Sequence, residues 1–200
     1  MCGFVTVFDS NNSYPNDNDK IILNEMLSSL NHRGPDSEGV YFSKKGASFG
    51  HKRLSIIDIE HGIQPMLSDD SRFILVFNGE IYNYLELRSY LIQKGVTFSS
   101  FSDTEVLLKL LIHDGPDKAL ARLNGMFAFI FFDQKESSWV AARDHFGIKP
   151  IYFFELNNKI IFSSEIKSLL LHPKVNAKRS QDALLQYLSF QLCLGNNTLF

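Results

Sequence analysis

The second residue of the chain, Cys2, combines a nucleophilic side chain with a position next to the N-terminus. If Met1 is removed, Cys2 carries a free α-amino group, whose unperturbed pKa of about 7.7–8.0 suits a general base near neutral pH. Because a thiol is only partly ionised at pH 7, the adjacent amine would activate it as histidine activates other nucleophiles. Cys2 is therefore a candidate nucleophile that contains its own base. The alternative is a second-position cysteine with no catalytic role.

Asn78 and Gly79 could stabilise negative charge on a reacting oxygen. They follow the apolar run 73–77, so a side-chain amide and an N–H group without a neighbouring Cβ stand together where a strand is expected to end. Such donors can form an oxyanion hole, in which one well-placed donor stabilises a tetrahedral intermediate by roughly 2.7–4 kcal/mol. An Asn-Gly hairpin turn is the alternative interpretation.

Three charged residues suit a substrate with both an α-carboxylate and an α-amino group. Arg53 closes an expected strand, and its guanidinium can bind a carboxylate through two parallel hydrogen bonds. Glu80 and Asp103 supply carboxylates for an ammonium group, so the three together fit an amino acid. The alternative for Arg53 is a surface ion pair. The alternative for Asp103 is helix capping, because Ser102 and Glu105 have capping-box spacing.

The composition argues against several classes of protein. The chain has 200 residues, enough for one globular core, and 20 Lys and Arg against 22 Asp and Glu give a formal net charge of −2, which disfavours a nucleic-acid partner. The longest strongly apolar run, 126–132, is far shorter than the roughly 20 residues of a membrane helix, and the N-terminus does not read as a signal peptide. The sequence predicts a cytoplasmic protein without membrane association.

The cysteines and histidines do not indicate a metal site. Cys2 and Cys193 stand at opposite ends of the chain without CxxC spacing, so neither a disulfide nor a zinc site is expected, and Cys193 is interpreted as an ordinary thiol. The histidine-containing segments 31–36 and 143–147 lack metal-ligand spacing and are interpreted as structured loops. No histidine is marked as a partner for Cys2, which disfavours a cysteine protease.

Short strand-like runs occur in groups between amphipathic helices. Because the strands do not alternate strictly with helices, the pattern predicts an α+β fold with antiparallel sheet. The run 126–132 is apolar on both faces, as is typical of a strand covered on both sides. The expected helices lie near 19–30, 84–95, 106–115 and 182–190, another helix closes at 169–173, and the expected strands are 3–8, 39–42, 48–53, 72–77, 126–132, 139–142 and 151–154.

Several short motifs follow one another in order over nearly the whole chain. They are Met1-Cys2-Gly3, His32-Arg33-Gly34-Pro35-Asp36, Arg53-Leu54-Ser55-Ile56-Ile57-Asp58, Gln64-Pro65-Met66, Asn78-Gly79-Glu80-Ile81-Tyr82-Asn83, Ser102-Asp103-Thr104-Glu105, Asn124-Gly125-Met126-Phe127-Ala128-Phe129 and Arg143-Asp144-His145-Phe146-Gly147-Ile148-Lys149-Pro150. The set resembles the glutaminase domain of glutamine-hydrolysing asparagine synthetases, class II glutamine amidotransferases of the N-terminal nucleophile (Ntn) hydrolase superfamily. The resemblance implies a four-layer αββα sandwich of mainly antiparallel sheets.

The resemblance also implies a reaction and a role for each candidate residue. The thiolate of Cys2 would attack the side-chain amide of L-glutamine, ammonia would depart, and water would hydrolyse the γ-glutamyl thioester to glutamate. Asn78 through its side chain and Gly79 through its N–H would form the oxyanion hole. The substrate-binding residues would be Arg53 for the α-carboxylate, and Glu80 and Asp103 for the α-amino group.

The resemblance implies a longer protein as well. Family members continue into a C-terminal synthetase domain whose Ser-Gly-Gly-x-Asp-Ser loop binds ATP, and that motif does not occur in this sequence. We therefore expect a glutaminase domain over 2–172, followed at 173–200 by a linker and the start of the synthetase domain. The glutaminase domain would need no cofactor and no metal, since ATP and Mg²⁺ would serve the synthetase domain.

The acceptor of the ammonia stays open at this point. In the family it is aspartate, which becomes asparagine, but relatives amidate other carboxylates such as sugar acids. The expected partners are L-glutamine and the synthetase domain, with a homodimer as a candidate assembly. A non-catalytic binding or regulatory module with the same fold is the alternative from another class, and the presence of all six candidate site residues favours the enzyme.

Overall fold

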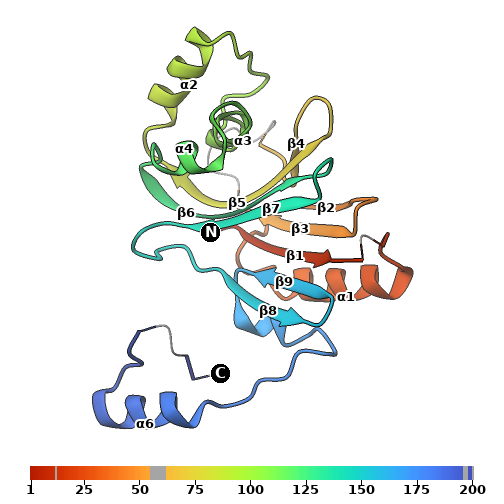
Figure 1. Cartoon of the computed structure of the whole chain (residues 1–200), viewed down its shortest axis with the longest axis vertical. Helices are drawn as coiled ribbons and strands as arrows, with labels where there is room; N and C mark the ends of the chain where they lie inside the picture. Colours follow the sequence, from red (N-terminus) through yellow and green to blue (C-terminus); the bar gives the residue numbers. More distant parts are fainter. Residues whose placement is uncertain (12, 55–61, 196–197, 200) are drawn as a thin grey trace.

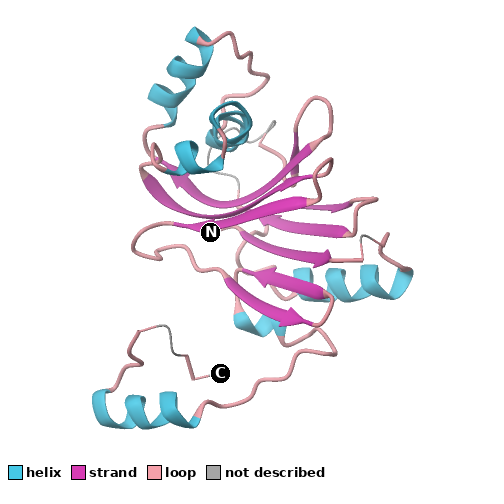
Figure 2. Cartoon of the chain, viewed as in Figure 1, coloured by secondary structure: helices cyan, strands magenta, loops and turns pink. Residues whose placement is uncertain are grey.

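Two antiparallel β-sheets lie face to face at the centre of the computed structural model, and helices cover their outer faces (Figures 1 and 2). The structure describes residues 1–11, 13–54, 62–195 and 198–199. Successive side chains along a strand point to opposite faces of its sheet, so each strand contributes to two layers. The layers are helix, sheet, sheet and helix, and the expected α+β sandwich is confirmed.

The five-stranded sheet carries the N-terminus. Its strands are β1 (Gly3–Asp9), β2 (Ser37–Phe42), β3 (Ala47–Arg53), β8 (Tyr152–Leu156) and β9 (Lys159–Ser163). The strand order is β2-β3-β1-β9-β8, and all neighbours are antiparallel. Because Gly3 lies opposite Lys52 in the register of β1 and β3, the N-terminus lies beside the end of β3.

The four-stranded sheet faces the first one. Its strands are β4 (Met66–Leu67), β5 (Phe73–Ile81), β6 (Gly125–Asp133) and β7 (Ser138–Arg143), in that order and all antiparallel. The two long strands pair over their whole length, from Phe73 opposite Asp133 to Ile81 opposite Gly125. The short β4 pairs with β5 only at 74–75, and no other strand of the described residues pairs with that edge of β5.

Aromatic side chains fill the space between the sheets. Phe8 of β1 lies at their centre, with its ring centroid 5.2 Å from that of Phe132 and 5.4 Å from that of Trp139. The inward face of β6 joins this layer, while its outward face packs against helices. This explains why the run 126–132 is apolar on both faces, as the sequence indicated.

The helices divide between the outer faces of the two sheets. The helices α2 (Tyr84–Gln93), α3 (Asp103–Asp114) and α4 (Pro116–Leu120) share a buried apolar cluster with β5 and β6. The helix α1 (Asp17–Ser28) and the short α5 (Ile166–Leu169) share another with β1 and β9. Burial of these apolar faces stabilises the sandwich at about 25 cal/mol per Å² of apolar surface removed from water.

The last helix, α6 (Gln181–Phe190), lies apart from both sheets (Figure 1). An extended segment after α5 leads to it, and Cys193 contacts its first turn, with Sγ 3.7 Å from the Ala183 carbonyl oxygen. The boundary expected between 172 and 173 stays a prediction. Among the described residues, no helix has the length and apolar character needed to cross a membrane.

The expected elements near 72–83 need correction. The strand predicted over 72–77 continues to Ile81, because the polar residues after 77 stay paired with β6. The sequence also gave no prediction for β4, β9 and α4, which are short and have little periodicity. Their positions depend on neighbouring strands and helices, not on their own residues.

Candidate active site

All six residues singled out in the sequence line one cavity of about 180 Å³ at the end of the sandwich where β1 begins. They come from four parts of the chain: the N-terminus, the end of β3, the second half of β5 and the start of α3. The N-terminus itself lies between the sheets (Figure 1). The residues are Cys2, Arg53, Asn78, Gly79, Glu80 and Asp103.

Cys2 directly precedes β1, and its thiol faces the end of β3. Its Sγ accepts a hydrogen bond from the Leu54 N–H at 3.4 Å and lies 3.6 Å from the Leu54 carbonyl oxygen, to which the thiol can donate. Burial raises the pKa of the Cys2 thiol, and the opposing effects of the Leu54 backbone and the Arg53 charge do not cancel it. The thiol therefore needs a base to become a nucleophile.

Arg33 holds the backbone of Cys2, a contact that the sequence reasoning missed. Its Nε donates to the Cys2 carbonyl oxygen at 2.8 Å, and its Nη1 donates to Glu165 Oε1 at 2.8 Å. Burial would raise the pKa of Glu165, but hydrogen bonds from Arg33 and His32 outweigh it and lower the pKa to about 2. Glu165 therefore stays ionised and fixes the guanidinium beside Cys2.

The signal available for this contact was Gly34, which follows the arginine. A Cβ at Gly34 would lie 2.4 Å from the Arg53 nitrogen, so only glycine lets the loop approach the end of β3 this closely. A glycine next to an arginine in a polar loop does not by itself reveal what the arginine binds. The partner Glu165 lies far away in the sequence and reaches Arg33 only in the folded chain.

Asn78 and Gly79 lie inside β5, so both the expected strand end and the hairpin interpretation are wrong. Asn78 pairs with Ala128, and its side chain is on the face of β5 that looks toward the five-stranded sheet. Its Nδ2 is buried and has no hydrogen-bond partner among the described residues. A Cβ at Gly79 would lie 2.2 Å from the Met126 carbonyl oxygen, so β6 leaves no room for a side chain. A buried donor without a partner, such as Asn78 Nδ2, lowers the stability of the fold. Such donors occur at sites that bind an acceptor.

The N–H of Gly79 points away from β6, to the edge of β5 on which β4 pairs only at 74–75. On that edge the Phe77 N–H donates to Gln64 Oε1 at 2.6 Å, and the Ile81 N–H donates to Asp103 Oδ2 at 3.1 Å. Backbone N–H groups two residues apart in a strand point the same way, so the Gly79 N–H shares this edge. Both Asn78 and Gly79 line the cavity that contains Cys2.

The charged residues of the cavity differ in their exposure. Arg53 and Asp103 are buried, with 6% and 5% of their surface exposed, whereas Glu80 is exposed. Burial raises the pKa of Asp103 to about 6, and the negative charge of Glu80 adds to the rise. A carboxylate with a raised pKa is stabilised when a cation binds beside it, which suits a site for an ammonium group.

The N-cap of α3 is Ser102, whose Oγ accepts a hydrogen bond from the Glu105 N–H at 3.2 Å. The capping box is only half formed, because the Glu105 carboxylate accepts hydrogen bonds from the backbone N–H groups of Ser99 and Ser100 instead. The cap is therefore made without Asp103, which reaches β5 and the cavity.

Lys149 lines the cavity, and the sequence did not indicate it as a site residue. The loop after β7 winds around the carboxylate of Asp144, which accepts hydrogen bonds from four backbone N–H groups, including that of Lys149. Lys149 is 5% exposed, and its Nζ lies 3.2 Å from Met1 Sδ. The motif at 143–150 was the available signal, but the direction of this side chain follows only from the winding of the loop.

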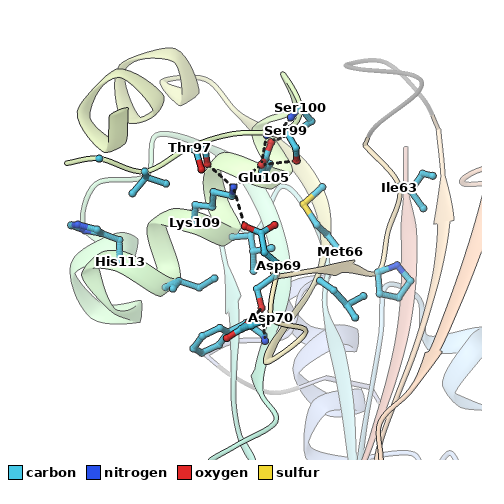
Figure 3. Close-up of a pocket in the computed structure, with 18 residues that line it drawn as sticks. Ile63, Met66, Asp69, Asp70, Thr97, Ser99, Ser100, Glu105, Lys109 and His113 are labelled. Atoms are coloured by element: carbon cyan, nitrogen blue, oxygen red, sulfur yellow. Dashed lines mark hydrogen bonds and ion pairs between the residues drawn. The ribbon is translucent and has the colours of Figure 1, made fainter. Parts of the chain in front are cut away.

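A larger cavity of about 650 Å³ lies beside α3, between the segments 63–70 and 95–100 (Figure 3). Lys109, one of its charged residues, pairs with Glu105 and Asp69. Lys109 Nζ lies 3.0 Å from Glu105 Oε1 and donates to the Thr97 carbonyl oxygen at 2.6 Å. Within the described part of the chain, no group of three or more His, Cys, Asp and Glu side chains is arranged to hold a metal ion.

The sandwich is that of a glutamine amidotransferase domain: the family model of that description matches residues 1–200, and the chain belongs to the family. Among its relatives, asparagine synthetase [glutamine-hydrolyzing] 1 of Bacillus subtilis (strain 168) is 43% identical over 199 residues, which cover 100% of this chain and 31% of the relative. Asparagine synthetase [glutamine-hydrolyzing] 3 of the same organism is 37% identical over 186 residues, covering 92% and 30%. The chain thus spans about a third of the length of these relatives.

Two solved structures share the fold. Glutamine phosphoribosylpyrophosphate amidotransferase from Bacillus subtilis, complexed with ADP and GMP, aligns with a TM-score of 0.71 and 21% identity, covering 85% of this chain and 43% of that one. A structure described as the allosteric regulatory enzyme of purine biosynthesis aligns with a TM-score of 0.69 and 22% identity, with the same coverage. The expected resemblance to the glutamine amidotransferase domain of asparagine synthetases and the α+β sandwich fold are therefore confirmed.

Proposed function

We propose that this chain, once Met1 is removed, hydrolyses L-glutamine to glutamate and ammonia with Cys2 as nucleophile. The observation that carries the proposal is that Cys2 and Asn78 line one cavity, and that the buried donor Asn78 Nδ2 has no hydrogen-bond partner among the described residues. A buried donor without a partner among the described residues does not stabilise the fold, so this donor calls for another role.

The charged groups of the cavity match the two ends of an amino acid. The Arg53 guanidinium binds the α-carboxylate, and the carboxylates of Asp103 and Glu80 bind the α-ammonium group. Because all three lie in the same cavity as Cys2, the glutamine side chain is directed toward the thiol. Substrates that lack either charged group lose the ionic contact with Arg53 or with the two carboxylates, which disfavours them.

The proposed reaction proceeds through a thioester. The α-amine of Cys2 takes the thiol proton, and Sγ attacks the side-chain carbonyl carbon, whose oxygen becomes an anion held by Asn78 Nδ2 and the Gly79 N–H. The protonated amine then gives its proton to the amide nitrogen, and as the C–N bond breaks this nitrogen leaves as NH₃. The same amine then takes a proton from water, whose oxygen attacks the thioester, and glutamate leaves as Sγ regains the proton.

Removal of Met1 is a condition of this mechanism. While Met1 is attached, the nitrogen of Cys2 is a peptide nitrogen and cannot accept a proton. The raised pKa of the buried thiol makes a base necessary. Met1 is 57% exposed, so it is accessible to an aminopeptidase.

The ammonia would serve a synthetase domain that amidates aspartate to asparagine with ATP and Mg²⁺. The names of the relatives and their greater length support this part of the proposal. It is tested on the full-length protein by asparagine formation that depends on glutamine, aspartate and ATP. Amidation of another carboxylate, such as a sugar acid, with no asparagine formed, would contradict it.

The glutaminase activity is tested by glutamate release from the Met1-free chain, with Cys2→Ala as the inactive variant and Cys193→Ala as the matched control. We expect release by the wild type and by Cys193→Ala, and a loss of at least about 1,000-fold in Cys2→Ala. Equal release by the wild type and Cys2→Ala would contradict the proposal. So would the absence of release from folded, Met1-free protein, both alone and within the full-length chain.

A further inference from the structure

His51 is a polar side chain in the aromatic layer between the two sheets. It lies on β3, opposite Phe4 of β1, and is 0% exposed. Its Nε2 lies 3.0 Å from the carbonyl oxygen of Phe77 on β5, in the facing sheet. Burying an imidazole among apolar side chains costs free energy, so this hydrogen bond between the sheets calls for an explanation.

The bond defines the protonation state of the ring. A carbonyl oxygen only accepts hydrogen bonds, so Nε2 carries a proton and donates it to Phe77. Burial lowers the pKa of His51 to about 4, and the positive charge of Arg53 on the same strand contributes. The ring is therefore neutral at pH 7, with Nδ1 unprotonated, and Nδ1 has no partner in the described part of the chain.

The acceptor of this bond belongs to the oxyanion-hole segment. The carbonyl group of Phe77 and the nitrogen of Asn78 form one planar peptide group, so fixing that oxygen also fixes the orientation in which Asn78 begins. The N–H of Phe77 is held in turn by Gln64 Oε1 at 2.6 Å. Phe77 is thus anchored through both of its backbone polar groups, directly before the two candidate donors.

The donor of this bond belongs to the strand beside the nucleophile. In the register of β3 and β1, His51 lies opposite Phe4 and Lys52 lies opposite Gly3, so β3 runs alongside the residue that follows Cys2. The Cys2 thiol also contacts the Leu54 backbone, just beyond β3. The bond from His51 therefore connects the part of the sandwich that holds Cys2 with the part that holds Asn78 and Gly79.

We propose that His51 is a positioning residue that sets the oxyanion donors of β5 at the correct distance from the Cys2 thiol. It is not among the residues that line the cavity, so it acts through the Phe77 peptide and not on the substrate. This inference rests on the proposed glutaminase activity. Because the oxyanion exists only in the transition state and the intermediate, displaced donors lower kcat and leave glutamine binding unchanged.

The test compares substitutions that keep or remove the donor at the position of Nε2. Phenylalanine fills the volume without a donor, glutamine carries an N–H donor of similar reach, and asparagine is too short to reach the Phe77 oxygen. We expect His51→Phe and His51→Asn to lower kcat about 10- to 100-fold with KM within about 3-fold. We expect His51→Gln to retain kcat within about 3-fold of the wild type.

A second readout isolates the oxyanion from folding. The aldehyde analogue of glutamate, with an aldehyde in place of the side-chain amide, forms a tetrahedral adduct with Cys2. Its affinity should fall in His51→Phe by the same factor as kcat, while binding of glutamine to the Cys2→Ala background stays unchanged. Phe49→Leu, two residues earlier on β3 in the same layer, is the matched control that loosens packing without removing a polar contact.

The possible failures are distinguishable. If the wild type releases no glutamate, the proposed function fails. If the wild type is active and folded His51→Phe and His51→Asn keep their kcat, or lose kcat only as much as an equally destabilised Phe49→Leu, the positioning role is wrong. If His51→Phe does not fold, the comparison of His51→Gln with His51→Asn decides, and equal kcat values for these two would overturn the inference.

Discussion

Asp103 and Glu105 lie in the same turn of α3, yet their carboxyl groups behave in opposite ways. The pKa of Asp103 is raised to about 6, because burial and the nearby charge of Glu80 outweigh the backbone hydrogen bonds that the carboxylate accepts. Burial acts on Glu105 too, but hydrogen bonds from Ser100 and Ser99 outweigh it and lower the pKa to about 2 (Figure 3). Hydrogen bonds outweigh burial at Glu105, whereas burial outweighs hydrogen bonds at Asp103.

The same difference separates the two cavities that these residues line. The cavity beside Glu105 has about 650 Å³, and there the Glu105 carboxylate is paired with Lys109. The cavity that contains Asp103 has about 180 Å³, and it is lined by Cys2 and by Asn78, whose Nδ2 has no hydrogen-bond partner among the described residues. Polar groups left unmatched by the protein, and not the size of a cavity, therefore mark the site where a substrate would bind.

The largest effect is expected from the unmatched donor itself. Asn78→Ala removes one oxyanion contact and should lower kcat for glutamine hydrolysis about 100- to 1,000-fold, with KM within about 3-fold. Steady-state glutamate release measures both. The control is Ser100→Ala, which removes a hydroxyl of the larger cavity that is hydrogen-bonded within the protein, and it should keep kcat within about 3-fold. Equal losses of kcat in the two variants would contradict the distinction between the cavities.

The next effect is expected at Asp103, the carboxylate whose pKa is raised by burial. Asp103→Asn keeps an oxygen for the Ile81 N–H but loses the charge that faces the substrate ammonium group. We expect kcat/KM to fall about 10- to 100-fold, mainly through KM. Because burial disfavours the charged form of Asp103, the free energy of unfolding at pH 8 should not decrease. A decrease of more than about 1 kcal/mol, measured by urea unfolding, would indicate a structural role instead.

The raised pKa of Asp103 also predicts a pH dependence of binding. The carboxylate loses its charge as the pH falls through about 6, so the affinity of Cys2→Ala for glutamine should weaken about tenfold between pH 7 and pH 5. Calorimetric titration at each pH measures this. The double variant Cys2→Ala/Asp103→Asn should show no such change, and a parallel change in both would assign it to another group.

The smallest effect on activity is expected at Glu105. Glu105→Gln weakens the hydrogen bonds to Ser99 and Ser100, so it should reduce the free energy of unfolding by about 1–3 kcal/mol while kcat/KM changes less than about 3-fold. The folded pKa of about 2 lies below the unfolded value of 4.5, so the charge stabilises the fold above pH 4.5 and this contribution is lost as the pH falls to 2. The variant should show a smaller loss of Tm over that range.

The nucleophile and the charged candidates could be found from the sequence because each has a local signal. Cys2 is marked by its position, Arg53 by the end of a strand, and Asp103 by the start of a helix. Arg33 and Lys149 could not be found in this way. Their positions at the site are visible only from their contacts with Cys2 and Met1, and these contacts form only when the N-terminus packs in the folded chain.

The sequence by itself determined the α+β class and most of the strands and helices, because periodicity and turn residues are properties of neighbouring positions. It also singled out six residues, all of which line the cavity. Only the tertiary structure decided that β5 continues through Asn78 and Gly79, since pairing with β6 outweighs the local tendency of Asn-Gly to turn. It also decided that the N–H of Gly79 faces an open edge and that His51 reaches across to Phe77. Strand register and sheet packing join residues far apart in the chain, and no local pattern records which residues those are.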